Sequence, residues 1–238
     1  MSPVRSLAGL GRPSLLAALV FSLLALVAFI AAGRSGRRDL NEAGKRALFT
    51  TFGFTALATI SLITALLAHD FSLRYVANYT SRSLSLPYTI SALWGGMEGS
   101  LLFWTTLLTG FSTLAIARAP ARSSKLVGSA GAVLMGIAAF FLFIVAFPGN
   151  PFAQVAGVIP TDGNGLNPLL QSPGMMIHPP LLYTGFVGFS IPFAFAIGAL
   201  FTKRLDDSWF TATRQWTLFA WTALSVGIVL GGAWAYTE

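Results

Sequence analysis

The chain has 238 residues, of which 55% are hydrophobic and only 10% are charged, and it contains no cysteine. Soluble domains contain about a quarter charged residues, so this composition excludes an ordinary soluble protein and indicates an integral membrane protein without disulfides, thiolate metal sites or redox dithiols of its own. The net charge of +7 comes from basic residues in short segments beside apolar runs, a pattern typical of membrane topology and not of nucleic-acid binding.

Six uncharged apolar segments follow one another along the chain, each long enough to cross a hydrocarbon core of about 30 Å as a helix. Transmembrane β-strands would be half as long and would alternate in polarity. The sequence therefore predicts an all-α integral membrane protein, a bundle of about six transmembrane helices that forms a single membrane domain over residues 1–238. The predicted helices cover approximately residues 14–32, 47–68, 100–117, 126–147, 180–201 and 215–236.

The first apolar segment also has features of a signal peptide, because basic residues precede it and small residues follow it. Its apolar run is longer than that of a signal peptide, and Arg34, Arg37 and Arg38 follow at once. We therefore expect it to be retained as the first transmembrane helix.

Lysine and arginine are unequally divided between the two sides of the predicted membrane. Eleven lie on one side, and the positive-inside rule predicts that this side is cytoplasmic. Both chain termini and the two long loops, 69–99 and 148–179, are then extracytoplasmic. The eleven are Arg34, Arg37, Arg38, Lys45, Arg46, Arg118, Arg122, Lys125, Lys203, Arg204 and Arg214, and the other four are Arg5, Arg12, Arg74 and Arg82.

The positions of the charged and polar residues argue against a transport function. All eight acidic residues lie outside the helix centres, whereas proton and ion pathways usually need ionisable groups at depth. A channel or small-solute transporter subunit would need polar groups there, and the hydroxyls of the third helix serve helix packing equally well. These hydroxyl residues are Thr105, Thr106, Thr109, Ser112 and Thr113.

The first long loop ends in a glycine-rich turn that contains Trp94 and Glu98. Glycines around these residues suit a tight turn at the membrane surface, and Glu98 at the start of the third helix favours the positive end of its dipole. An interfacial aromatic anchor explains Trp94 equally well. His69 lies beside Asp70 at the end of the second helix and is interpreted as a solvated helix cap.

The second long loop leads to His178, one of only two histidines in the chain, followed by Pro179 and Pro180. We expect Pro179 to keep His178 out of helical geometry and Pro180 to begin the fifth helix. A neutral imidazole on such a stiff backbone suits axial ligation of a haem iron. The alternative is an interfacial histidine that is hydrogen-bonded to a loop carbonyl. Trp234, near the end of the last helix, fits an aromatic belt.

Four segments carry a resemblance to a known family and occur in order over most of the chain. They are 70-DFSLRYVANYTS-81, 87-PYTISALWGGMEGSLLFW-104, 165-GLNPLLQSPGMMIHPPLLYTGFVGFSIPFAFAI-197 and 231-GGAWAYTE-238. In these segments the chain resembles the N-terminal portion of the CcmF/CycK/NrfE family, cytochrome c-type biogenesis proteins that include the membrane haem lyase subunit. The resemblance ends just before the tryptophan-rich WWD motif of that family, so we expect either a truncation or a naturally split protein.

The resemblance implies a part of a haem lyase, which attaches haem to the cysteines of a CxxCH site in apocytochrome c outside the cytoplasm. His178 matches the first outward-facing histidine of the family by its HPPLLYTG setting, which implies axial ligation of haem iron. Trp94, Glu98, Pro179, Pro180 and Trp234 would support it, and no catalytic side chain is expected.

The implied partners are a haem chaperone, apocytochrome c, a CcmH-like thiol subunit and membrane lipid, in a bacterial inner membrane or its organellar equivalent. The second axial ligand, the ligands of a b-type haem and the WWD motif would come from a C-terminal half or a separate chain. The alternative is a structural or assembly subunit of the haem lyase complex that binds no haem itself. Alone, the chain is not expected to be an active lyase.

Overall fold

The computed structural model describes residues 9–119, 124–203 and 208–237. Six helical segments in these ranges are long and apolar enough to cross a membrane, which confirms the predicted all-α membrane fold with six spans. The long helices are α2 (Gly11–Ser35), α3 (Arg38–Leu67), α6 (Met97–Arg118), α7 (Ser124–Ala146), α8 (Pro173–Gly188), α9 (Ser190–Thr202) and α10 (Ser208–Thr237), with α8 and α9 forming the fifth span together. The short elements are α4 (Arg74–Tyr79), α5 (Leu86–Ser91) and the 3₁₀ turns η1 (Ala92–Trp94) and η3 (Pro168–Leu170).

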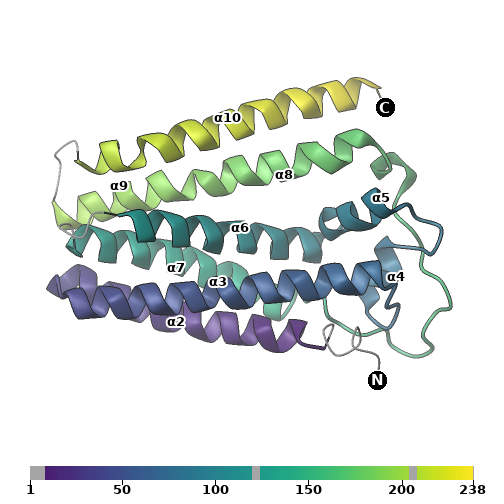
Figure 1. Cartoon of the computed structure of the whole chain (residues 1–238), viewed down its shortest axis with the longest axis horizontal. Helices are drawn as coiled ribbons and strands as arrows, with labels where there is room; N and C mark the ends of the chain where they lie inside the picture. The colour runs from purple at the N-terminus through teal and green to yellow at the C-terminus, as the bar shows by residue number, and fades with distance from the viewer. Residues whose placement is uncertain (1–8, 120–123, 204–207, 238) are drawn as a thin grey trace.

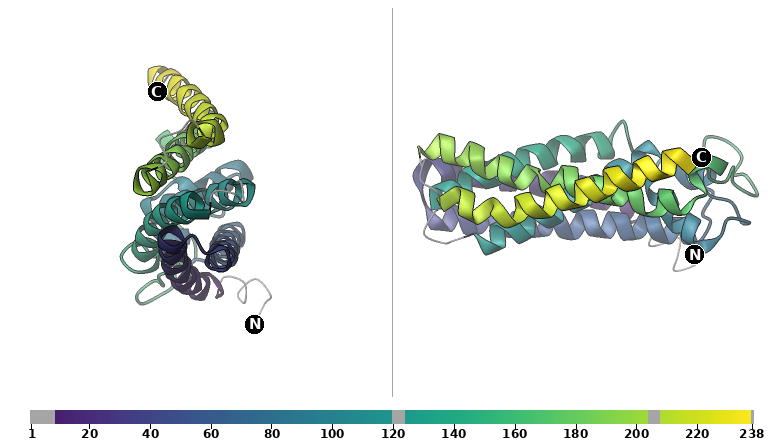
Figure 2. Two further views of the ribbon diagram at one scale, coloured as in Figure 1. Left: turned by 90° about the vertical axis from the view of Figure 1, so that its left-hand side faces the viewer. Right: turned by 90° about the horizontal axis from the view of Figure 1, so that it is seen from above.

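The helices lie side by side in an elongated bundle (Figures 1 and 2). α2 and α3 lie at one edge, α10 lies at the opposite edge beside α8 and α9, and α6 and α7 lie between them. α2 begins and α10 ends at the same end of the bundle, where α4 and α5 also lie (Figure 1). The span in α10 is only 17% buried, whereas the other five are between 33% and 50% buried.

Small residues bring the helices into close contact. A Cβ atom added to Gly128 of α7 would lie 2.5 Å from the backbone nitrogen of Gly33 in α2. Lipid tails are as apolar as leucine, so helices in a membrane associate through close packing more than through the hydrophobic effect. These two glycines therefore allow α2 and α7 to pack against each other with their backbones in contact.

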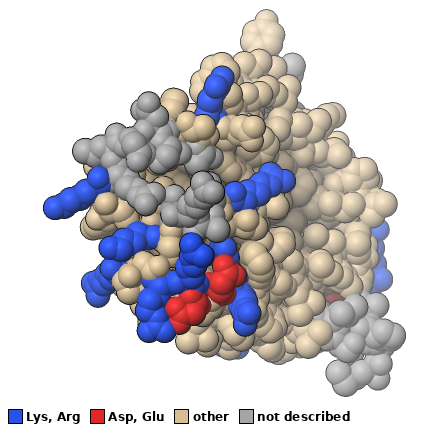
Figure 3. Space-filling model, turned by 60° about the vertical axis from the view of Figure 1, so that its left-hand side comes forward, with Lys and Arg blue, Asp and Glu red and all other residues tan. Residues whose placement is uncertain are grey.

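The two ends of the bundle differ in charge. Nine of the eleven basic residues assigned to one side by sequence belong to the described ranges, while Arg122 and Arg204 lie outside them. These nine lie at or near the end where α2 meets α3 and where α9 leads to α10, and Figure 3 shows basic side chains gathered there. The α4 and α5 end, with Arg74 and Arg82, is opposite.

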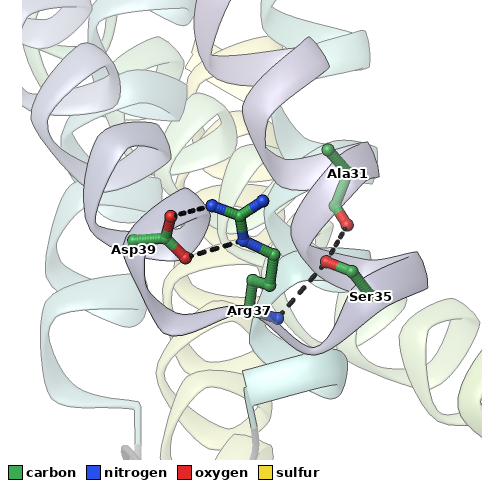
Figure 4. A network of polar contacts seen from close by, with 4 residues as sticks. All are labelled: Ala31, Ser35, Arg37 and Asp39. Carbon is green, nitrogen blue, oxygen red and sulfur yellow. Dashed lines mark hydrogen bonds and ion pairs between the residues drawn. The ribbon is translucent and has the colours of Figure 1, made fainter.

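The turn between α2 and α3 is fixed by a small polar network (Figure 4). The Ser35 hydroxyl donates to the carbonyl of Ala31 at 2.7 Å and accepts the backbone N–H of Arg37 at 3.3 Å. The Arg37 guanidinium forms an ion pair with Asp39 in the first turn of α3. The aspartate also lies at the positive end of the α3 dipole, so two favourable interactions hold this turn.

The predicted start of the fifth helix is wrong. α8 begins at Pro173, and His178, Pro179 and Pro180 all lie within it. The Ser172 hydroxyl accepts the N–H of Met175 and caps the helix, and Pro173 takes the first helical position, where its missing N–H costs little. A proline two turns later is tolerated in a transmembrane helix when another donor pairs with the carbonyl that it leaves free.

The hydroxyl residues of the third span serve helix packing. The Thr109 hydroxyl is 2.9 Å from that of Thr55, and the Thr106 hydroxyl is 2.7 Å from that of Thr59. Both pairs join α6 to α3, so these polar groups are used within the bundle. Over the described part of the chain, the buried hydroxyls of Ser112 and Thr113 have no hydrogen-bond partner.

Candidate functional site

The two long connections form a single cap over the α4 and α5 end of the bundle. The cap is built from segment 70–99 and segment 148–172, whose backbones pair with each other at several points. Backbone pairing of this kind fixes loops that would otherwise expose unsatisfied polar groups. The hydrogen bonds run from Arg74 N–H to Ala153 O at 2.8 Å, Val155 N–H to Ser72 O at 2.9 Å, Asn164 N–H to Ala77 O at 2.8 Å and Gly165 N–H to Thr80 O at 3.0 Å.

Asp162 adds a charged connection between the same two segments. Its carboxylate accepts the backbone N–H groups of Arg82 at 2.9 Å and Gly163 at 2.8 Å. These two hydrogen bonds lower the pKa of Asp162, because they favour its ionised form. The Arg82 side chain donates to Thr161 O and lies 5.6 Å from the ring centre of Phe71.

Tyr75 of α4 supports the glycine-rich turn that carries Trp94. Its buried hydroxyl donates to Ala92 O at 2.8 Å and accepts the N–H of Gly96 at 3.1 Å. Burial raises the pKa of Tyr75 well above its ordinary value, because the phenolate would be poorly solvated there. The turn before α6 is therefore an ordered part of the cap, as its glycines and aromatic residues predict.

Replacing Tyr75 with phenylalanine should reduce the free energy of unfolding by about 1–3 kcal/mol, because the Gly96 N–H loses its acceptor in a buried place. At pH values above 10.0, the ordinary pKa of tyrosine, the folded protein keeps the phenolic proton of Tyr75, whereas the unfolded chain releases it. Stability from this group is complete below about pH 10 and falls as the pH rises further. Thermal unfolding at pH 8 and pH 10.5 should show a smaller alkaline loss in Tyr75→Phe than in the wild type. Tyr236→Phe is the control, since Tyr236 is 92% exposed, and an equal effect of both variants would contradict this assignment.

His178 lies in the second turn of α8, at the cap end, and faces α10. Its Nδ1 atom is 2.7 Å from the carbonyl oxygen of Gly227. A carbonyl can only accept, so Nδ1 carries the proton, and in the neutral ring Nε2 holds the free electron pair. Within the described residues Nε2 makes no hydrogen bond. The ring is thus held in one orientation, and its Nε2 has no hydrogen-bond partner in the described part of the chain.

Gly231 and Trp234 of α10 complete the surroundings of the imidazole. A Cβ atom at Gly231 would lie 2.2 Å from Cε1 of His178, so only glycine leaves room for the ring. The ring of Trp234 is centred 5.9 Å from that of His178. His178 and Trp234 line a cavity of about 400 Å³ together with apolar residues such as Ile177 and Leu230.

The sequence-based prediction did not include Gly227 and Gly231, although both determine how His178 is held. Their spacing, 227-GIVLG-231, is a GxxxG motif within an apolar helix, and this motif is typical of close helix packing in membranes. It could have indicated that α10 packs against another helix at this point. The motif does not indicate which residue of the other helix packs against these glycines.

Trp94 contacts α8 directly and supports the turn that precedes His178. Its indole N–H donates to the carbonyl of Met175 at 2.9 Å. Met175 is four residues before Pro179, whose nitrogen has no hydrogen to donate to that carbonyl. Trp94 therefore supplies the donor that Pro179 lacks, and it connects the first cap segment to the helix that bears His178.

Trp94→Phe should reduce the free energy of unfolding by about 1–3 kcal/mol, because the Met175 carbonyl is left without a donor in the helix interior. Trp221→Phe is the matched control, since Trp221 is 61% exposed. Thermal unfolding of the two variants in the same detergent makes the comparison. Equal stability of Trp94→Phe and the wild type would show that this hydrogen bond contributes nothing.

Glu98 lies elsewhere in the cap, and His69 lies just before its first segment. Glu98 is in the first turn of α6, and together with burial its charge raises the pKa of Tyr79. His69 follows α3 with a left-handed backbone, φ 52°, which agrees with a role at the helix end. His69 is intermediate in exposure, and its Nε2 is buried without a hydrogen-bond partner among the described residues, so the side chain is only partly solvated.

The contacts of His178 match those that a metal-binding histidine usually has. A histidine ligand usually has its other ring nitrogen bonded to a carbonyl or carboxylate, which fixes the tautomer and the ring direction. Here the Gly227 carbonyl is the partner of the other ring nitrogen. The cavity that His178 lines is apolar and includes the aromatic ring of Trp234. Over residues 9–119, 124–203 and 208–237 no cluster of three or more potential metal-binding side chains occurs.

Comparison with known proteins places this arrangement in a family. The family model described as cytochrome C assembly protein matches residues 94–238, which include Trp94, His178, Gly227 and Gly231. The chain belongs to the cytochrome c assembly protein family. It is 41% identical to the cytochrome c-type biogenesis protein CcmF of Pseudomonas aeruginosa over 230 residues, which is 96% of this chain and 35% of the relative.

Other relatives agree with this family membership. The chain is 42% identical to CcmF of Escherichia coli over 85% of its own length and 32% of the relative. It is 37% identical to the biogenesis protein NrfE of Haemophilus influenzae over 78% of its length and 29% of the relative. The solved structure of the cytochrome c haem lyase CcmF superposes on it with a TM-score of 0.83 and 35% identity, over 97% of this chain and 36% of that one. The chain thus spans about a third of the length of these family members and corresponds to their N-terminal portion.

Proposed function

We propose that the chain forms the haem-presenting part of a cytochrome c haem lyase, with His178 as one axial ligand through Nε2. The observation that carries the proposal is the hydrogen bond between Nδ1 and the Gly227 carbonyl, because in the neutral ring it leaves the proton on Nδ1 and the free electron pair on Nε2, in a residue that lines an apolar cavity. The alternative, an interfacial histidine hydrogen-bonded to a loop carbonyl, would not need a glycine at position 231 of a membrane helix to receive its ring. Haem would be the cofactor or cargo held at this place.

In this proposal the basic end of the bundle faces the cytoplasm, in agreement with the positive-inside rule. The cap, Trp94 and His178 then lie on the extracytoplasmic side of the membrane. This is the side on which haem and apocytochrome would meet. The protein would be located in a bacterial inner membrane or its organellar equivalent.

The work of this part of the lyase is positioning. A bound haem would supply the vinyl groups to which the two thiols of a CxxCH site add. The Gly227 carbonyl fixes the plane of the imidazole, Trp94 supports the α8 turn before it, and Trp234 limits the space beside it. Fixing a reacting partner in one orientation lowers the entropic part of the barrier without acid–base catalysis by the chain.

Other sequence would complete the site, since the chain spans about a third of its relatives. The opposite axial ligand, a tryptophan-rich WWD platform and the ligands of a b-type haem would come from that sequence, on the same or another polypeptide. A haem chaperone, apocytochrome c and a CcmH-like thiol subunit would be the partners. Thioether formation thus belongs to the complete lyase.

A second candidate is an assembly role without haem binding. It is favoured by α10, whose span is only 17% buried and so leaves a long apolar surface for other helices of the complex. In this case His178 would act only as a packing residue between α8 and α10.

An absorption spectrum separates the two candidates. The chain is purified together with its completing sequence, and haem is quantified by the Soret band at equal protein concentration. We expect the Soret absorbance to fall when His178 is replaced, by the share of the haem at the cap end, while a b-type haem bound by the completing sequence keeps its own absorbance. A band of equal intensity in the variant, with normal assembly of the complex, would support the assembly role instead.

A further inference from the structure

A second cavity lies at the basic end of the bundle, away from His178. It has a volume of about 580 Å³ and lies between α2, α7 and α9. Three cations line it, namely Arg34, Lys125 and Lys203. Its size is in the range of about 300–1,000 Å³ that is usual for small-molecule sites.

The three cations come from three different helices. Arg34 is in the last turn of α2, Lys125 is in the first turn of α7, and Lys203 follows α9 in a left-handed conformation, φ 53°. Among the described residues the ion pairs are Arg37 with Asp39 and Lys45 with Glu42, so none of these three cations has a carboxylate partner there. Asp206 and Asp207 lie outside the described ranges.

Lys125 is held toward the cavity by the α2–α3 turn. A Cβ atom at Gly36, where φ is 73°, would lie 3.2 Å from Cε of Lys125. The aliphatic part of the lysine therefore lies across this glycine. A side chain that packs its stem and leaves its ammonium group exposed is suited to bind an anion at the membrane surface.

The remaining wall is apolar and opens toward the lipid. Ile30, Val133 and Phe201 line it, and Phe201 is 77% exposed. The neighbouring face of α2 is also exposed and apolar, for example at Val27, which is 66% exposed. Cations next to an apolar wall match a ligand with an anionic head and a hydrocarbon tail.

We propose that this groove binds an anionic phospholipid. Its phosphate lies among Arg34, Lys125 and Lys203, and an acyl chain follows Ile30, Val133 and Phe201 along the membrane. Basic pockets between transmembrane helices on the cytoplasmic side commonly hold anionic lipid head groups. A free phosphate would use the cations but not the apolar wall, and a zwitterionic lipid would gain little from three cations that have no carboxylate partner among the described residues.

The test measures lipid binding to the full chain purified in detergent. Native mass spectrometry follows a titration with phosphatidylglycerol and, separately, with phosphatidylcholine of the same acyl chains. We expect preferential binding of phosphatidylglycerol, and the variant Arg34→Gln/Lys125→Gln/Lys203→Gln should bind it about a hundredfold more weakly, since each cation near an anionic head group contributes about a fivefold change.

The control variant, Arg46→Gln/Arg118→Gln/Arg214→Gln, removes the same charge at the same end but does not change the groove. It should keep its affinity within about threefold, because screening weakens the effect of distant charges. Equal losses in both variants would overturn the proposal, as would equal binding of the two lipids by the wild type. Complete competition by millimolar inorganic phosphate would also overturn it in favour of a simple anion site.

Discussion

His178→Ala should abolish haem retention at the cap end of the bundle and the assembly of holocytochrome c. In the proposed function the imidazole is the ligand itself, so the loss should be at least as large as the roughly hundredfold loss that follows from removing a supporting contact of a metal ligand. Cells that carry the complete lyase with this substitution are assayed for covalent haem in their c-type cytochromes, and the purified protein is assayed for its Soret band. Normal yields in both assays would exclude axial ligation by His178.

Two controls separate loss of a ligand from loss of the fold. His69→Ala removes the other histidine of the chain and should leave the Soret band unchanged, because His69 lies under the cap next to Phe71. His178→Gly leaves a space that added imidazole can fill, and we expect imidazole to restore the Soret band in this variant. A correctly assembled variant that imidazole does not restore would indicate a packing role for His178.

Gly231→Ala should cause a loss nearly as large, although Gly231 carries no functional group. The added methyl group would lie 2.2 Å from Cε1 and 2.6 Å from Nδ1 of His178, so the ring must turn away from α10. Turning breaks the hydrogen bond to Gly227 and releases the tautomer that leaves Nε2 free. Removing such a supporting contact typically lowers metal affinity by about 10–100-fold. A haem titration followed at the Soret band measures this affinity.

Gly232→Ala is the matched control for this substitution. Gly232 is the next residue of the same helix, and a Cβ atom there meets nothing within 4 Å. Alanine favours a helix over glycine by about 1 kcal/mol, so neither substitution should weaken α10 itself. Unchanged haem affinity in Gly231→Ala, or an equal loss in both variants, would contradict the geometry inferred for His178.

The number and type of the spans could be predicted from sequence because each depends on one local property. About twenty uncharged apolar residues specify a transmembrane helix whatever surrounds them. The start of the fifth helix could not be predicted in the same way. Pro179 and Pro180 locally predict a helix boundary, but α8 continues through them. The donor that pairs with the Met175 carbonyl is Trp94, in the first cap segment.

In the candidate site, too, some features could be predicted from sequence and others depend on tertiary contacts. By itself, the sequence determined that the protein is a six-helix membrane protein, that its charge is concentrated on one side, and that His178 is a candidate ligand in a family-like setting. Only the tertiary structure decided that the ring lies in a helix, that Gly227 fixes its tautomer and that Gly231 makes room for it. The reason is physical: hydropathy and net charge are properties of single segments, whereas the direction of an imidazole depends on which residues of a distant helix pack against it.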